Sequence, residues 1–293
     1  MSLIERTDFY AITAALLWGL NYVVVKSVLN TVPENLFLLV RFTATVFIIG
    51  LFLILRRKPI KLRRRDLPKI LLLGVVGVGL YNILWTFGIH RTTAANAGLI
   101  ISTSPFFAQL YQQLVQKEKA GWRRWFFILL AFWGIFLIIG QSPGSRFDFS
   151  SQTLLGNVVT LGGALLFTFY TVYAKPLLQN YSAFELNGLT MAAGLPVLVL
   201  YCLVAGPLMI PKLTYSIVWE MAYVVGFGTI AAFVCWYAGV KHCGPIKVIL
   251  FHSLVPIASL ALGYLFLHEP VNLVQIGGGI LAFTGIIAAK SGK

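Results

Sequence analysis

The stretch HSLVPIASLALGYLFLHEP at residues 252–270 is a long apolar run with a proline near its start and an acid followed by a proline at its end. In a soluble helix, an interior proline such as Pro256 removes a backbone hydrogen bond and costs about 3 kcal/mol. In a membrane, the freed carbonyl is tolerated where neighbouring helices, hydroxyls or water satisfy it. The pattern therefore favours a membrane-spanning helix that bends near Pro256 and ends at Glu269.

The composition of the whole chain supports this interpretation. Of 293 residues, 58% are hydrophobic and 11% are charged, whereas soluble domains are about one quarter charged. Apolar runs of about 20 residues, enough to cross the hydrocarbon core as helices, follow one another with short polar breaks, without the alternation of a porin-like barrel. We predict an all-α integral membrane protein with ten transmembrane helices, at residues 10–28, 35–55, 68–88, 95–115, 125–141, 153–174, 183–205, 217–239, 246–266 and 272–289.

The net charge of +14 follows from the arrangement of the loops and needs no nucleic-acid partner. With the N-terminus in the cytoplasm, most lysines and arginines fall on the cytoplasmic side, above all in RRKPIKLRRR at residues 56–65. This is the asymmetry of the positive-inside rule. The sequence predicts a multi-pass protein of the cell inner membrane with both termini in the cytoplasm, and the basic loop can also contact anionic lipid.

The second half of the chain repeats features of the first. A gap-free shift of 151 residues brings aromatic, proline and acidic residues onto identical ones, and the first spans of the halves align more loosely at a shift near 149. The aligned pairs are Trp85 with Trp236, Ser102 with Ser253, Pro105 with Pro256, Glu118 with Glu269 and Gly134 with Gly285, and WGLNYVVVK at 18–26 aligns with FTFYTVYAK at 167–175.

Each half holds five of the predicted spans, and five is an odd number. Two tandem copies of an odd-numbered unit enter the membrane from opposite sides, which makes an inverted repeat. We therefore predict two inverted five-helix repeats, at residues 1–142 and 143–293. Inverted repeats supply the two equivalent arrangements that alternating access requires, with substrate held near the midplane, so the sequence predicts a transporter.

Short motifs in a fixed order resemble those of one known family. They are WGxN with a following lysine (Trp18, Gly19, Asn21, Lys26), Arg41 followed by Phe42, and the proline–glutamate pair of each half. These motifs resemble the EamA family of the drug/metabolite transporter superfamily. The resemblance implies a secondary carrier, often an exporter of amino acids or other small metabolites, whose cavity is lined mainly by the first, third and fourth helices of each half. Because the fold does not determine the substrate, the alternative of an uptake carrier or exchanger for a nucleotide-like or phosphorylated metabolite stays open.

Polar and aromatic residues inside the spans are the candidates for binding a small-molecule substrate. Asn21 either binds substrate or ties two helices together. Trp85 and Trp236 either line the cavity or anchor at the membrane interface, and Tyr170 and Tyr173 either hold a ring or cation or simply pack. The substrate-binding candidates are Trp18, Asn21, Tyr22, Asn82, Trp85, Ser102, Ser104, Tyr170, Tyr173, Trp236, His252 and Ser253.

Hydroxyl side chains precede the proline of the fourth span in each half. Ser102 and Ser104 stand before Pro105, and Ser253 stands before Pro256. A hydroxyl can satisfy the carbonyl that proline frees, or it can hydrogen-bond substrate in a wet cavity. We expect both prolines to bend their helices where these face the cavity.

A few ionisable residues are candidates for coupling or anion pairing. His252 lies well inside a span, where an ionisable group is a functional hypothesis, although it can equally be a neutral histidine bonded to a neighbouring helix. The acids lie at span edges or in loops, which leaves His252 and Glu185 for proton coupling. Lys26 can pair an anion or snorkel toward the headgroups. Arg41 needs water or a partner, such as Glu34.

The sequence contains no motif for the common hydrolytic or ATP-driven mechanisms. No P-loop, GxSxG, HExxH or CxxC is present, and Cys202, Cys235 and Cys243 lack metal or redox spacing. We therefore expect no enzyme, no metal and no cofactor. The alternative from another class is a membrane-embedded enzyme or a receptor, and the sequence leaves open whether the chain is a monomer or a homodimer.

Overall fold

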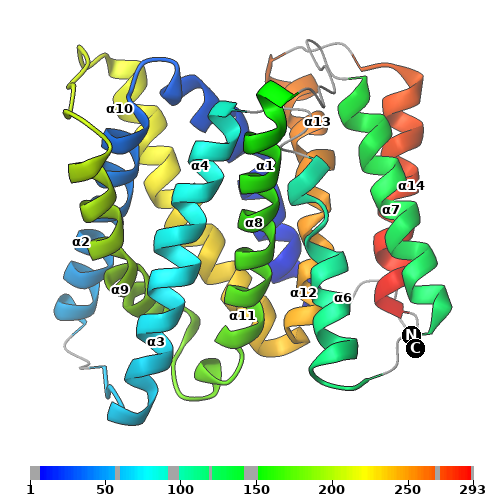
Figure 1. Ribbon diagram of the computed structural model, residues 1–293, viewed down its shortest axis with the longest axis horizontal. Helices are drawn as coiled ribbons and strands as arrows, with labels where there is room; N and C mark the ends of the chain where they lie inside the picture. Colours follow the sequence, from blue (N-terminus) through cyan, green and yellow to red (C-terminus); the bar gives the residue numbers. More distant parts are fainter. Residues whose placement is uncertain are drawn as a thin grey trace.

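The chain folds as a bundle of membrane-spanning helices. The computed structural model describes residues 7–56, 60–91, 99–118, 121–141, 151–267 and 271–291 (Figure 1). Every regular element in these ranges is helical, and nine helices there are long and apolar enough to cross a membrane. The α-helices are α1 (Asp8–Leu29), α2 (Glu34–Leu55), α3 (Leu67–Leu73), α4 (Tyr81–Arg91), α6 (Ser104–Leu114), α7 (Trp122–Gly140), α8 (Ser151–Ala174), α9 (Ala183–Val204), α10 (Tyr215–Tyr223), α11 (Ala232–Cys243), α12 (Pro245–His252), α13 (Leu254–Leu267) and α14 (Leu273–Ser291).

Nine of the ten predicted spans coincide with these membrane-length helices. The remaining one, predicted at residues 95–115, is described only from residue 99 onward. Its described part is helical to Ile101 and again in α6. The all-α, multi-pass class predicted from composition is therefore confirmed, with nine helices of membrane-spanning length and composition within the described residues.

Two of the spans contain a π-helical segment. The third span runs α3, η2 (Gly74–Leu80), α4, and the eighth runs α10, η4 (Val224–Ala231), α11. Since η4 ends 151 residues after η2, the two segments occupy equivalent places in the two halves. A π-helical turn carries an extra residue and often lies at a functional site. It turns the residues that follow, which in α4 begin at Tyr81, onto a different face of the helix.

The fourth and ninth spans are interrupted just before their prolines. In the first half the helix breaks at Ser102 and Thr103, and in the second it breaks at Ser253 between α12 and α13. Pro105 has no N–H to give to the carbonyl of Ile101, and Ser104 Oγ donates to that carbonyl over 2.8 Å instead. The hydroxyl thus satisfies the group that the proline frees.

Helices α7 and α14 stand side by side at one edge of the bundle (Figure 1). A Cβ at Gly134 would overlap the backbone of Gly278 and Ala282, and one at Gly285 would overlap the backbone of Phe127 and Ala131. The two sets of contacts are equivalent under the shift of 151 residues, which relates Gly134 to Gly285, Phe127 to Gly278 and Ala131 to Ala282. Small residues let membrane helices approach closely, so this seam depends on both glycines.

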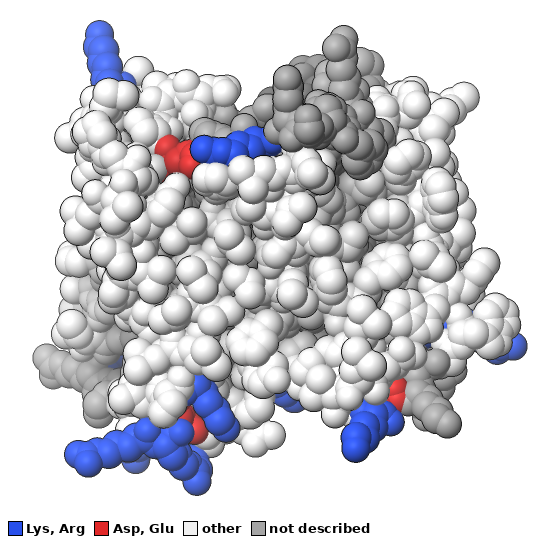
Figure 2. All heavy atoms as spheres, in the orientation of Figure 1, with Lys and Arg blue, Asp and Glu red and all other residues white. Residues whose placement is uncertain are grey.

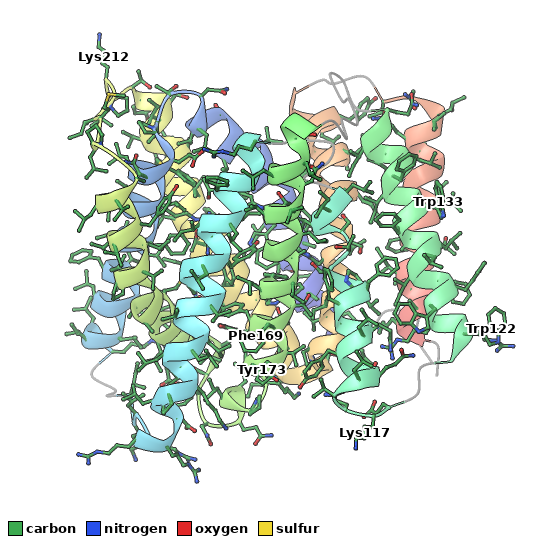
Figure 3. All side chains as sticks on the ribbon, viewed as in Figure 1. Lys117, Trp122, Trp133, Phe169, Tyr173 and Lys212 are labelled. Atoms are coloured by element: carbon green, nitrogen blue, oxygen red, sulfur yellow. The ribbon has the colours of Figure 1, made fainter. Side chains whose placement is uncertain are left out.

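Charged side chains gather at the two ends of the molecule, with a broad uncharged band between them (Figure 2). More lysine and arginine side chains lie at the end where both termini lie (Figures 1 and 2). Lys117 and Lys212, which the sequence assigns to opposite sides of the membrane, lie at opposite ends (Figure 3). At the end with the termini, the buried Lys290 of α14 forms an ion pair with the fully buried Asp8 of α1.

Candidate functional site

A pocket with a cavity volume of about 30 Å³ lies where helices of the two halves meet. Its wall draws on α1, α2 and α4 from the first half and on α8, α11 and α12 from the second. Most ligand sites are concave, largely apolar and contain a few convergent polar groups, and this pocket has that character. The lining residues are Trp18, Asn21, Arg41, Tyr81, Asn82, Trp85, Phe167, Phe233 and His252.

Arg41 supplies a positive charge to the pocket. Its side chain is 4% exposed, and its Nε donates to Thr229 Oγ1 over 2.8 Å. The guanidinium carbon lies 5.8 Å from the ring centre of Phe37 and 5.2 Å from that of Phe42. The sequence suggested Glu34 as a partner of Arg41, but this hydrogen bond is made to Thr229 instead. Glu34 lies two helical turns before Arg41 on α2, whereas η4 places Thr229 next to Arg41. Among the described residues, Arg41 forms no ion pair with an acid.

Two asparagines also line the pocket. Asn82 donates from Nδ2 to the carbonyl of Val78 over 2.8 Å, so its amide oxygen is left to face the pocket. Asn21 is 4% exposed, and its Oδ1 is buried without a hydrogen-bond partner among the described residues. That oxygen rests against Gly228, where a Cβ would overlap it. The Nδ2 donor is therefore the atom of the Asn21 amide left for a ligand.

Aromatic rings form much of the remaining wall of the pocket. Trp18 contacts Phe167, Phe233 and His252 edge-on, with centres 5.8, 5.2 and 5.7 Å apart, and its indole nitrogen donates to the carbonyl of Gly228 over 3.1 Å. Phe167 stacks on His252 at 4.5 Å. His252 is 5% exposed, and its Nδ1 has no partner among the described residues. This wall suits an apolar or aromatic body, with His252 as its one titratable ring.

Two predicted site residues of the second half lie behind the pocket wall. Trp236 is fully buried and donates to Thr171 Oγ1 over 3.0 Å. The Tyr170 hydroxyl lies 3.4 Å from Thr190 Oγ1, which lies 3.4 Å from the Tyr237 hydroxyl, and all three side chains are fully buried. These side chains satisfy one another, so their hydrogen-bonding groups are not offered to a ligand.

The hydroxyls near the prolines line a separate, smaller cavity. Ser102, Pro105 and Ser253 border a cavity of about 10 Å³ that is otherwise walled by apolar residues of the fifth, ninth and tenth spans. Pro256 lies in α13, just beyond it. Ser104 is fully buried and points to the Ile101 carbonyl. The structure thus separates these serines from the group around Trp18 and Arg41.

The other predicted residues lie elsewhere or outside the described side chains. Tyr173 is 41% exposed and lies toward one end of α8, next to Phe169 (Figure 3). Glu185 forms a capping box with Ser182 at the start of α9, so its carboxylate stabilises a helix end. The side chains of Tyr22 and Lys26 lie outside the described part.

Five residues that shape the pocket were not among the predicted ones. Tyr81, Phe167 and Phe233 line it, Thr229 holds Arg41, and Gly228 makes room for Asn21. The repeat contained a signal for two of them. Phe167 aligns with Trp18, and Phe233 lies 151 residues after Asn82.

The pocket can bind a ligand through the guanidinium of Arg41, the amide groups of Asn21 and Asn82, and its aromatic side chains. Within the described ranges, no residue lining the pocket is acidic, and no group of three or more His, Cys, Asp and Glu is placed to hold a metal ion. The arrangement can therefore orient and desolvate a small solute between the halves of the bundle.

Membrane transport proteins have this architecture: a multi-pass helical bundle with a pocket where its halves meet. The chain belongs to the EamA-like transporter family, whose family model matches residues 6–140 and again residues 154–289. The earlier resemblance to this family, and with it to the drug/metabolite transporter superfamily, is confirmed.

Similar proteins from bacteria and archaea are also named as transporters. The chain is 22% identical to the uncharacterized transporter YoaV of Bacillus subtilis, over 94% of this chain and 93% of YoaV. It is 26% identical to the uncharacterized transporter YetK of the same species, over 92% and 82%. It is 23% identical to an uncharacterized transporter of Archaeoglobus fulgidus, over 92% and 93%. A solved crystal structure matches with a TM-score of 0.80 at 18% identity, covering 97% of this chain and 96% of the other, which shows a shared fold.

Proposed function

We propose that this membrane transporter is a secondary carrier that exports small metabolites, with amino acids as the first cargo to test. The observation that carries the proposal is the pocket itself, because it is closed in by six residues of the first half and three of the second. A site at the junction of two halves is exposed to either side of the membrane when the halves rock against each other.

We propose that the rocking units are two inverted five-helix repeats, residues 1–142 and 143–293. Three features support them: the family model matches once in each half, η2 and η4 lie at equivalent positions, and the contacts of Gly134 and Gly285 are exchanged by a shift of 151 residues. The inner membrane with cytoplasmic termini is part of the same proposal. It is supported by the basic side chains at the end where the termini lie (Figure 2).

If transport is coupled to protons, His252 is the group that the pocket offers. It lines the pocket, whereas the other sequence candidate, Glu185, caps α9 away from it. A neutral imidazole that takes up a proton can pass it between the two sides as the halves exchange.

The experiment that tests the function is a flux screen in proteoliposomes with amino acids, amines, nucleotides and sugar phosphates, with and without a pH gradient. We expect saturable flux of at least one solute, and its gradient dependence decides coupling. Trp85→Ala and His252→Ala are expected to lower that flux with normal membrane insertion. Trp133→Ala is the matched control, because Trp133 is 58% exposed on the outer face of α7 (Figure 3).

Two results would contradict the proposal. If no solute moves and the purified protein instead turns over a lipid or polar substrate, the chain is an enzyme. If Trp85→Ala and His252→Ala both leave the kinetics unchanged, the pocket is not the cargo site.

A further inference from the structure

We propose that the cargo carries a negatively charged group, a carboxylate in the first instance, which binds Arg41, and that an ammonium group on the cargo is dispensable. The proposal rests on the carrier function and names its substrate class. It predicts that the charge of a solute affects its affinity for the pocket more strongly than its shape does.

The first step is the state of Arg41. An arginine stays protonated in proteins, and its planar guanidinium presents five N–H donors. One of them, on Nε, is taken by Thr229, and this leaves the two terminal nitrogens at the pocket without a hydrogen bond to another described residue. A buried cation is costly unless it is paired. An anionic ligand removes that cost, and a cationic ligand adds to it.

The second step is the direction of the neighbouring amide. Asn21 turns its Oδ1 toward Gly228, so the atom it leaves for a ligand is a donor. Arg41 and Asn21, on α2 and α1, therefore both present N–H groups to the same space. Guanidinium and amide donors together match the two oxygens of a carboxylate.

The third step is what the pocket offers to an ammonium group. The acceptors among its described lining residues include Asn82 Oδ1, a nitrogen of the neutral His252 ring, the Tyr81 hydroxyl and the faces of the rings, and none of them carries a negative charge. An amide oxygen and a ring face near a fixed guanidinium hold a cation weakly, since the positive charge of Arg41 opposes it. The rings of Trp18, Phe167 and Phe233 are instead suited to an uncharged aromatic or branched body.

The test compares solutes of one shape and different charge on the purified, full-length protein. The probes are 3-phenylpropanoate, its neutral amide 3-phenylpropanamide, phenylalanine and phenylalaninamide, with 4-methylpentanoate and 4-methylpentanamide as a second body. Binding is measured by ligand-induced thermal stabilisation and by competition with flux. We expect each carboxylate to bind roughly tenfold to a hundredfold more tightly than its amide, because hydrogen bonds to a charged group are worth about 1.5–3 kcal/mol. We also expect 3-phenylpropanoate to match or exceed phenylalanine.

The variants separate recognition from folding. Arg41→Gln is expected to bring carboxylate affinity down to the amide level while leaving amide affinity unchanged, so the ratio between them falls to about one. A purely structural role for Arg41 would lower both affinities together. Arg56→Gln is the matched control, since Arg56 directly follows α2 and also lies over a phenylalanine ring, that of Phe52 at 4.6 Å, but it is exposed.

Amides or amines that bind as tightly as the carboxylates would overturn the inference, as would a charge preference that persists in Arg41→Gln. If the flux screen finds a cargo without an anionic group, the carrier function stands and this inference fails. If nothing moves in the screen, it is the proposed function that fails.

Discussion

Arg41 of α2 and Thr190 of α9 occupy equivalent places in the two halves, yet they act in different ways. Helix α9 begins and ends 149 residues after α2, and the same shift relates Asn21 to Tyr170. In the first half, Arg41 and Asn21 line the pocket. In the second half, Thr190 and Tyr170 lie within hydrogen-bonding distance of each other and are fully buried.

The scaffold around these positions is much more alike. Both third helices of the halves contain a π-helical segment, both fourth helices break before a proline, and both fifth helices use a glycine at the seam between them. The two halves therefore share the features that shape and pack their helices, whereas the polar groups at these two positions line the pocket in the first half alone. Duplicated transporters need a symmetric framework, but a small solute without symmetry is best held by an asymmetric set of groups.

The largest expected effect concerns an ion pair between the two halves that the repeat does not duplicate. Lys290 of α14 pairs with Asp8, whereas the equivalent position in α7 is Ile139. Lys290→Met alone should destabilise the protein by about 3–5 kcal/mol, because it removes the cation that compensates a buried carboxylate. Thermal unfolding in detergent measures this. Adding Asp8→Leu should recover most of the loss, and a double variant as unstable as the single one would refute the explanation.

The seam between α7 and α14 tests the symmetric part of the comparison. Gly134→Leu and Gly285→Leu should each cost about 3 kcal/mol or more, because overpacking alone costs about 1–3 kcal/mol and these side chains would meet backbone. Gly279→Leu is the control, since nothing lies within 4 Å of a Cβ there. The yield of monodisperse protein and its thermal stability are the measurements. If one seam variant is tolerated and the other is not, the halves do not share this contact.

A smaller effect is expected at the glycine behind Asn21. Gly228→Ala places a methyl group where Asn21 Oδ1 now lies, so the amide must turn and its donor is misdirected. Cargo affinity should fall roughly threefold to tenfold, since a loss of about 1 kcal/mol corresponds to roughly a fivefold change. Gly226→Ala, in the same π-helical segment with open space around it, should bind cargo as the unchanged protein does. Equal affinities for the two variants would show that Asn21 does not take part.

The smallest effect is expected in the closed network of the second half. Tyr170→Phe removes one hydroxyl from the chain that links Tyr170, Thr190 and Tyr237. Stability should fall by about 1 kcal/mol, the usual net value of a hydrogen bond, with cargo affinity unchanged. Thermal unfolding and binding measured on the same sample decide this. A loss of affinity without a loss of stability would mean that this hydrogen-bonded network also takes part in binding cargo.

The sequence predicted the fold better than the site, for physical reasons. Hydrocarbon thickness fixes the length of a spanning helix, so apolar runs predicted nine described spans within a few residues. Intramembrane polarity pointed to Asn21, Arg41 and His252, and all three line the pocket. Their roles in binding cargo remain predictions.

The repeat does not predict how exposed each aligned residue is. Trp236 aligns with Trp85, which lines the pocket, but Trp236 is fully buried behind the pocket wall, where its indole nitrogen donates to Thr171. Thr229 gave no signal, because its contact with Arg41 depends on the turn of η4, and a π-helical segment rotates the residues after it in a way that helical spacing does not predict.

Alternating access of the pocket is the central claim, and a single reporter cysteine tests it most directly. Tyr81→Cys, made after Cys202, Cys235 and Cys243 have been replaced by alanine, places one thiol in the lining of the pocket. Vesicles of either orientation are then treated with a membrane-impermeant thiol reagent, with and without the cargo that the flux screen identifies. We predict labelling from both faces of the membrane and a lower rate at both faces when cargo is present. Labelling from one face alone under every condition would contradict a carrier in which two halves take turns in exposing a shared site.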